Sequence, residues 1–184
     1  MKEKLGVVFG RFQPLHKGHL ENILIPFNEC EFVYLGITNP DNHLIDYDKT
    51  DKNRSMRSSN PFTYFHRQEM IKRTLLDQKI PLNRFEIIPF PINFPELILD
   101  YSPKNALYYV ADLINDNANE WNLKKVSILR NLELRTKTLR NKRITSSTEV
   151  RKRIREGSAW EELVPKPVFN YINENGLTLG VEED

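Results

Sequence analysis

Cysteine is nearly absent from this 184-residue sequence, which contains only Cys30. A single cysteine excludes an intrachain disulfide and any cysteine-rich metal site within the chain. Long apolar runs are missing too, since no segment approaches the roughly 20 residues with which a helix spans a bilayer. The residues after Met1 carry no apolar stretch typical of a secretory signal. We therefore expect a protein of the reducing cytoplasm that contacts no membrane.

The sequence has almost no excess of charge of either sign. Its 27 lysines and arginines against 25 aspartates and glutamates give a net charge of +2, so we expect no nucleic-acid partner. Basic residues are concentrated between Lys124 and Arg155, where only Glu133 and Glu149 oppose them. We interpret most of this run as a solvated face. The part beside residues 144–151 would also neutralise a polyphosphate.

Short apolar runs alternate with segments of helical spacing along the chain. The runs are continuous, which is typical of parallel strands covered on both faces. This order predicts one domain, residues 1–184, with an α/β fold: a Rossmann-like open parallel sheet of four to five strands, helices on both faces and a small C-terminal helical segment at 145–184. Strands are expected at 5–9, 32–37, 85–88 and 126–129, and helices at 17–27, 63–76, 106–114, 149–155, 158–163 and 166–175.

Two predicted loops leave the carboxyl ends of strands, where open α/β sheets bind ligands. Residues 38–60 are polar and have no periodicity, and such long loops are usually functional or disordered. A substrate lid and a plain disordered loop both remain open for this segment. Residues 89–95 contain three prolines and are therefore neither a regular helix nor a central strand.

The first motif, residues 10–19, reads Gly-Arg-Phe-Gln-Pro-Leu-His-Lys-Gly-His and lies between a predicted strand and a predicted helix. Free N–H groups and the helix dipole at such a turn favour phosphate. His16 and His19 would share one face of the first helical turn. Gly18 between them leaves out a side chain that would otherwise fill the space.

The second motif, residues 144–151, reads Ile-Thr-Ser-Ser-Thr-Glu-Val-Arg and opens another predicted helix. Its hydroxyl groups and free N–H groups could bind phosphate oxygens. Arg151 lies one turn into the helix and could clamp the same oxygens in a bidentate manner. An ordinary N-cap would need only one of these hydroxyls, and both interpretations can hold at once.

The first motif resembles the signature G-x-F-x-P-x-H-x-G-H of the nucleotidylyltransferase superfamily, and the second motif resembles its second signature. The nearest resemblance is to archaeal-type nicotinamide-mononucleotide adenylyltransferases, and it extends over residues 60–63, 88–94 and 160–165. It implies transfer of AMP from ATP to nicotinamide mononucleotide, giving NAD and pyrophosphate. It also implies Mg²⁺ bound with ATP rather than a metal held by protein side chains. Members of this family often form oligomers, which leaves a homo-oligomer open.

Roles for individual residues follow from the same resemblance. An acceptor phosphate is already anionic at pH 7 and needs no general base, so the site should position its substrates and neutralise charge. The implied catalytic residues are His16, His19 and Arg151. The implied nucleotide-binding residues are Gly10, Arg11, Phe12, Gly18, Ser146, Ser147 and Thr148.

The acceptor side departs from the family pattern. The family has an arginine directly before its Asn-Pro-Phe-Thr element, whereas Ser59 stands here and the nearest arginine is Arg57. The family's tryptophan that stacks on nicotinamide is missing, although Phe94 could stack in its place. Asn93 could hydrogen-bond a carboxamide or simply cap its own loop. The acceptor is therefore either nicotinamide mononucleotide or another phosphate-bearing small molecule.

Residues 130–143 are shorter than the corresponding family segment and poor in apolar residues. Either the last strand is vestigial, or the base-binding side of the pocket is built differently. Three hypotheses follow: adenylyl transfer to nicotinamide mononucleotide, the same chemistry on another acceptor or with CTP, and a nucleotide-binding regulator without turnover. The intact histidine pair and second motif favour catalysis.

Overall fold

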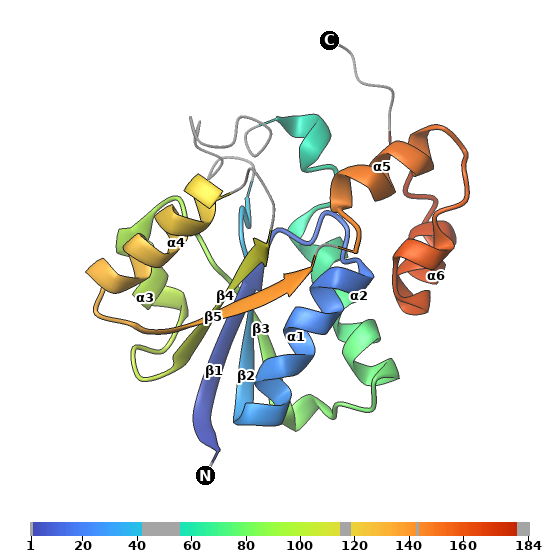
Figure 1. Ribbon diagram of the computed structural model, residues 1–184. Coiled ribbons are helices and arrows are strands. Elements are labelled where there is room, and N and C mark those ends of the chain that lie inside the picture. Colours follow the sequence, from blue (N-terminus) through green and yellow to red (C-terminus); the bar gives the residue numbers. More distant parts are fainter. Residues whose placement is uncertain (1, 42–55, 115–118, 143, 180–184) are drawn as a thin grey trace.

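The computed structural model describes residues 2–41, 56–114, 119–142 and 144–179, and of residues 112–114, 119, 141 and 142 only the backbone. A five-stranded parallel sheet with the order β3-β2-β1-β4-β5 forms its centre (Figure 1). The strands are β1 Glu3–Gly10, β2 Cys30–Ile37, β3 Phe85–Pro89, β4 Leu107–Ile114 and β5 Arg135–Lys142. The helices are α1 Lys17–Glu29, α2 Tyr64–Asp77, α3 Ile98–Tyr101, α4 Asn119–Asn131, α5 Ser147–Arg155 and α6 Lys166–Glu174.

Helices cover both faces of the sheet, as the sequence predicts. Neighbouring strand residues point to opposite faces, so Val8 packs in the core that α1 and α2 cover, whereas Val7 packs in the core beneath α3 and α4 (Figure 1). The chain winds from β1 towards β3 on one side and then crosses to β4 and β5 on the other. This reversal of strand order beside β1 is the place where doubly wound sheets bind ligands.

The C-terminal helices pack on the α2 side of the sheet. The ring nitrogen Nδ1 of His66 lies 2.9 Å from the hydroxyl of Tyr171, which joins α2 to α6. Gly157 and Gly176 follow the ends of α5 and α6 with φ values of +65° and +57°, the conformation that ends helices at glycine. Of the helix expected at 158–163, only the 3-10 turn Glu161–Leu163 forms.

Two expected elements were wrong. Residues 106–114, expected as a helix, are the strand β4, and residues 126–129, expected as a strand, lie inside α4. A short apolar run has no periodicity that separates a buried strand from a buried helix segment. Tyr108, Tyr109 and Val110 are all buried because β4 lies between β1 and β5 and is covered on both faces.

Of the two alternatives for residues 130–143, the vestigial last strand was wrong. β5 has eight residues and pairs with β4 from Leu107↔Arg135 to Ile114↔Lys142. β5 is an edge strand and therefore needs few apolar side chains. Among its described side chains, that of Leu139 is buried. Arg135 and Lys137 form ion pairs with Glu3 and Glu29, which is consistent with the charged composition of edge strands.

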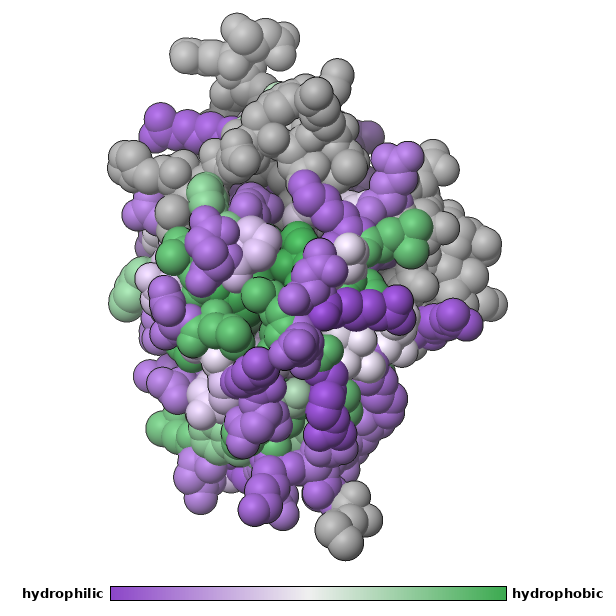
Figure 2. All heavy atoms as spheres, turned by 90° about the vertical axis from the view of Figure 1, so that its left-hand side faces the viewer, coloured by the Kyte–Doolittle hydropathy of each residue, from purple (hydrophilic) through white to green (hydrophobic). Residues whose placement is uncertain are grey.

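The face that carries α3 and α4 is mostly hydrophilic, with apolar side chains showing between the polar ones (Figure 2). Leu99, Tyr101 and Leu123 are exposed apolar residues of these two helices.

Within the described residues, no helix combines the length and the apolar character needed to cross a membrane. The homo-oligomer stays a prediction.

Candidate active site

The two motifs meet at the carboxyl end of the sheet. The hydroxyl of Ser147 donates to the carbonyl oxygen of Pro14 at 3.1 Å. The guanidinium of Arg151 donates to the carbonyl oxygen of Gln13 at 2.8 Å. The start of α5 is therefore bonded directly to the turn between β1 and α1 (Figure 1). The structure brings together the two segments that the sequence singles out.

The histidines of the first motif cap α1 reciprocally. His16 is the N-cap residue, and its Nδ1 accepts from the His19 N–H at 3.2 Å. Nδ1 of His19 accepts from the His16 N–H at 3.4 Å. The two rings stack with their centroids 3.6 Å apart. Because each Nδ1 is an acceptor, the neutral form of each ring carries its proton on Nε2, and both rings present a donor on that side.

Glycine at position 18 is required by the His16 ring. A Cβ atom there would lie 3.3 Å from Cε1 and Nδ1 of His16 and 3.3 Å from Cγ1 of Ile144. These contacts are tighter than ordinary van der Waals distances, so a side chain would push against both motifs. The imidazole of His16 thus fills the space that a side chain at position 18 would need.

Phe12 forms a wall of the turn. It is buried, has a φ of +52°, and its ring contacts His19 edge-on with the centroids 5.1 Å apart. A Cβ atom on Gly10 would come within 2.9 Å of the Phe12 ring. The side chains of this turn therefore pack inward, which leaves its main chain and the histidines to meet a ligand. Contact of Gly10 and Phe12 with a nucleotide stays a prediction.

Gln13 is a positioning residue that the sequence did not reveal. Its buried amide donates to the carbonyl oxygen of Phe62 and accepts from the Phe62 N–H, both at 2.9 Å. This pairing joins the first motif to the Asn-Pro-Phe-Thr segment. Nothing in the sequence distinguishes Gln13 from the variable positions of the motif.

Arg151 lies deeper than a surface phosphate clamp would. It is only 3% exposed and donates to Gln13, to Ser59 Oγ at 3.4 Å and to Thr148 Oγ1 at 3.4 Å. It therefore connects both motifs to the 3-10 turn Arg57–Ser59. Ser146 is the N-cap of α5, accepting from the Glu149 N–H at 3.1 Å, so the N-cap interpretation holds. Phosphate binding by Arg151 and these hydroxyls remains a prediction.

A second buried arginine, Arg67 of α2, lies beneath the first motif. Its guanidinium donates to the carbonyl oxygens of Arg11 at 3.0 Å, Thr38 at 2.7 Å and Asn39 at 2.7 Å. Burial lowers the pKa of Arg67 to about 10. Arg67 is not predicted from the sequence, because helical spacing alone does not show which polar side chain turns inward. The side chain of Arg11, assigned to the nucleotide, is half-buried above it.

The predicted acceptor side contains a chain of asparagines. Asn93 Nδ2 donates to Asn39 Oδ1 at 3.4 Å, and Asn39 Nδ2 donates to Asn60 Oδ1 at 3.5 Å. Asn60 Nδ2 donates in turn to the carbonyl oxygen of Met56 at 2.9 Å. The loop after β3, the end of β2 and the segment before α2 are thereby linked. Arg57 is exposed on the adjacent 3-10 turn, and Phe94 is half-buried beside Asn93.

The buried side-chain oxygen atoms that lack a hydrogen-bond partner within the described residues are Thr38 Oγ1, Asn93 Oδ1 and Thr145 Oγ1. They follow β2, β3 and β5 respectively, at the carboxyl edge of the sheet. A buried polar atom left unpaired is costly, so such atoms mark places where a ligand or water supplies the partner. The carboxyl edge of the sheet therefore carries polar groups suited to a bound ligand.

Neither tryptophan belongs to the loop after β3 that carries Asn93 and Phe94. Trp121 packs in the core beneath α4, and Trp160 packs on Phe169 with the ring centroids 4.7 Å apart. The substrate lid expected within 38–60 falls largely on residues 42–55, outside the described residues. Among the described residues, no group of three or more His, Cys, Asp or Glu side chains is arranged to hold a metal ion.

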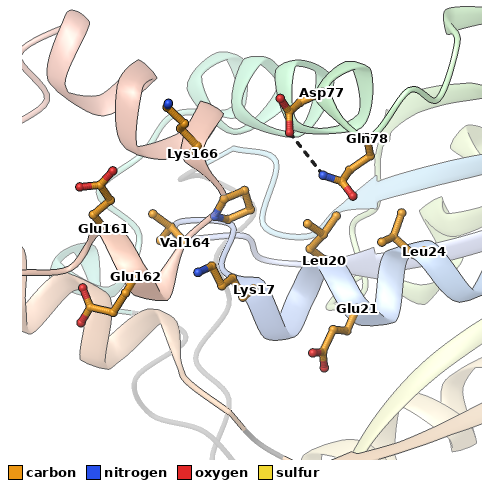
Figure 3. Close-up of a pocket in the computed structure, with 11 residues that line it drawn as sticks. Lys17, Leu20, Glu21, Leu24, Asp77, Gln78, Glu161, Glu162, Val164 and Lys166 are labelled. Atoms are coloured by element: carbon orange, nitrogen blue, oxygen red, sulfur yellow. Dashed lines mark hydrogen bonds between the residues drawn. The ribbon is translucent and has the colours of Figure 1, made fainter.

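A cavity of about 650 Å³ opens elsewhere, between α1, the end of α2 and the start of α6 (Figure 3). Lys17 and Lys166 line it together with Glu21, Asp77 and Glu161. Its mixed charges do not converge on one point in the close-up. The two motifs, not this cavity, contain the groups suited to phosphate.

Known proteins share both the sequence and the fold. Phosphonoformate cytidylyltransferase from Streptomyces viridochromogenes is 37% identical over 174 residues, which cover 94% of this chain and 92% of that protein. Nicotinamide-nucleotide adenylyltransferase from Thermococcus kodakarensis is 32% identical over 178 residues, covering 93% and 83%.

A solved structure from Francisella tularensis, a bifunctional NMN adenylyltransferase/ADP ribose pyrophosphatase, matches with a TM-score of 0.63. It is 19% identical, and the match covers 93% of this chain and 50% of that one. This chain therefore spans about half of the bifunctional protein, and the likeness concerns the fold alone. The family model of cytidylyltransferase-like proteins matches residues 7–153, so the chain belongs to the cytidylyltransferase-like family and is a nucleotidylyltransferase.

Proposed function

We propose that this enzyme transfers a nucleoside monophosphate from a nucleoside triphosphate to a small phosphonate or phosphate, with CTP and phosphonoformate as the leading pair. The observation that supports the chemistry is the direct bonding of the second motif to the turn that carries His16 and His19. The leading pair is supported by the 37% identity to a phosphonoformate cytidylyltransferase over nearly the whole chain. It is also supported by the loop after β3, which contains no tryptophan to stack on a nicotinamide ring.

In the proposed reaction, an anionic oxygen of the acceptor attacks the α-phosphorus of the triphosphate. The new oxygen–phosphorus bond forms as the bond from the α-phosphorus to the bridging oxygen breaks, and pyrophosphate leaves with that electron pair. No proton has to be removed, so the protein positions the groups and stabilises the developing charge. The Nε2–H groups of His16 and His19 would donate to the α-phosphate oxygens.

The second motif would hold the leaving pyrophosphate. The hydroxyls of Ser146, Ser147 and Thr148 stand at the start of α5, where the helix dipole favours negative charge. Mg²⁺ would enter with the triphosphate and neutralise part of its charge, since the described side chains offer no carboxylate cluster for it. Thr145 Oγ1, unpartnered within the described residues, is suited to the same phosphate or its water shell.

The second candidate is adenylyl transfer from ATP to nicotinamide mononucleotide. Asn93 Oδ1 favours it, because this buried acceptor has no partner within the described residues and a carboxamide N–H could supply one. Phe94 could stack on the nicotinamide ring, and Arg57 could bind the acceptor phosphate. The adenylyltransferase from Thermococcus kodakarensis supports this candidate at 32% identity.

A four-way assay of pyrophosphate release decides between the candidates. The purified protein is given CTP or ATP with Mg²⁺, each with phosphonoformate or nicotinamide mononucleotide. Release with CTP and phosphonoformate alone supports the first candidate, and release with ATP and nicotinamide mononucleotide alone supports the second. Tight triphosphate binding without release in any combination would contradict both and indicate the nucleotide-binding regulator.

A further inference from the structure

Arg67 binds four main-chain carbonyl oxygens with one side chain. Besides Arg11, Thr38 and Asn39, its Nε donates to the carbonyl oxygen of Thr63 at 3.3 Å. The residue is only 2% exposed. Its guanidinium thus joins the end of β1, the end of β2 and the start of α2, which are the elements that surround the first motif.

The charge of Arg67 has no carboxylate partner within the described residues. All of its hydrogen bonds go to neutral carbonyl oxygens. Its pKa of about 10 still leaves it protonated at neutral pH. A buried cation without a counter-ion is costly to maintain. A polyphosphate bound above the first motif would supply the missing negative charge.

The bond from Arg67 to the Arg11 carbonyl also sets the direction of the next peptide N–H. In a trans peptide the C=O and N–H groups point to opposite sides. The Arg11 carbonyl points to Arg67, so the Phe12 N–H points away from it. The carbonyl oxygen of Gln13, the residue after Phe12, accepts from Arg151. Within the described residues, the Phe12 N–H donates to no protein acceptor.

We propose that Arg67 is a positioning residue for the triphosphate: it withdraws the carbonyl oxygens of Arg11 and Thr38 from the phosphates and turns the Phe12 N–H towards them. The inference rests on the proposed function, because it assumes that the first motif binds a polyphosphate. Carbonyl oxygens that faced an anion would repel it, whereas an N–H group attracts it. Phe12 at a φ of +52° shows that the turn departs from an ordinary extended chain at this point.

Arg84 provides a matched control at the opposite edge of the same sheet. It donates to the carbonyl oxygens of Glu31 at 2.6 Å, Cys30 at 3.0 Å and Phe27 at 3.1 Å. These residues lie at the end of α1 and the start of β2, remote from both motifs. Arg84 therefore resembles Arg67 in how it ties loops together but has no route to the triphosphate. Replacing Arg84 should therefore lower the stability of the fold without changing the affinity for the triphosphate.

The test compares Arg67→Lys, Arg67→Met and Arg84→Met in the full chain. Isothermal titration calorimetry measures the Kd for CTP and for ATP, each with Mg²⁺ and without an acceptor, and thermal unfolding is recorded for each variant. Lysine keeps the charge but its single nitrogen cannot bind all four carbonyl oxygens. We expect at least tenfold weaker binding by Arg67→Lys and a larger loss in Arg67→Met. Arg84→Met should bind within twofold of the wild type although its melting temperature falls.

With triphosphate as substrate, Arg67→Lys should raise the KM for it more than it lowers kcat. If a folded Arg67→Lys variant bound the triphosphate with the affinity of the wild type, the inference would be overturned. An equal loss in Arg84→Met would overturn it as well, because the effect would then follow stability. If Arg67→Met does not fold, Arg67→Lys decides. A wild-type protein that binds neither CTP nor ATP would contradict the proposed function itself and the inference with it.

Discussion

Replacing Gly18 by alanine separates the stability of α1 from the placement of its histidines. Alanine is the better helix former, by up to about 1 kcal/mol in a helix interior. The new Cβ would nevertheless lie 3.3 Å from His16 Cε1 and Nδ1 and from Ile144 Cγ1. The His16 ring must then shift by a few tenths of an ångström. It cannot shift alone, because it stacks on His19 and shares two reciprocal hydrogen bonds with it.

A shift of this size should lower kcat by about tenfold, since a misplacement of about 1 Å costs around a hundredfold. The free energy of unfolding should change by no more than about 1 kcal/mol, because the gain in helix propensity and the strain at His16 oppose each other; this is about 2–4 °C in melting temperature for a chain of this length. Pyrophosphate release and thermal unfolding measure the two effects on one sample. A wild-type kcat in Gly18→Ala would contradict the claim that the placement of the His16 ring limits turnover.

Gly157→Ala is the control, because it should lower the stability of the fold without changing kcat. Gly157 has a φ of +65° and open space around it, so a Cβ there meets no neighbour but strains the backbone. We expect a loss of about 1 kcal/mol in the free energy of unfolding and an unchanged kcat. A fall of kcat in both variants would show that activity follows stability.

Three further predictions follow. His19→Ala should lower turnover at least a hundredfold in steady-state assays with its far-ultraviolet circular dichroism unchanged, because it removes a proposed phosphate donor; near-normal turnover would contradict that role. Gln13→Ala should cost about 2–3 kcal/mol in chemical denaturation, because it strands the buried main-chain groups of Phe62; a loss within experimental error would contradict this. The ammonium group of Lys137 holds the pKa of the Glu29 carboxyl below its ordinary value of 4.5, so the pair stabilises the fold above pH 4.5 and loses this effect as the pH falls through the lowered pKa. Lys137→Met should flatten that acid-side decline in unfolding experiments, and an unchanged pH dependence would contradict the assignment.

The sequence predicted those parts of the fold whose local pattern and tertiary environment agree. The runs 5–9 and 32–37 became β1 and β2 because continuous apolar residues suit strands buried on both faces. Residues 106–114 were expected as a helix and residues 126–129 as a strand, and both predictions were wrong. A strand that lies between two other strands and a helix that packs on the sheet both bury short apolar runs, so such a run does not distinguish them. β5 was missed because an edge strand can be mostly charged.

The site was predictable where residue type and spacing carry the chemistry. The histidine pair lies on one helical turn, and the second motif opens α5 as expected. Gln13 and Arg67 could not be predicted, because they act on main-chain groups of residues distant in sequence. Spacing along the chain does not show which carbonyl oxygens a buried arginine will reach.

The central claim is transfer of a nucleotidyl group to a phosphonate or phosphate oxygen. Mass spectrometry of the products, with pyrophosphate measured in the same reaction, tests it most directly. With CTP and phosphonoformate or with ATP and nicotinamide mononucleotide, we predict one nucleotide–acceptor conjugate for each pyrophosphate released. Free nucleoside monophosphate without a conjugate, or no pyrophosphate from a protein that binds the triphosphate, would contradict the account.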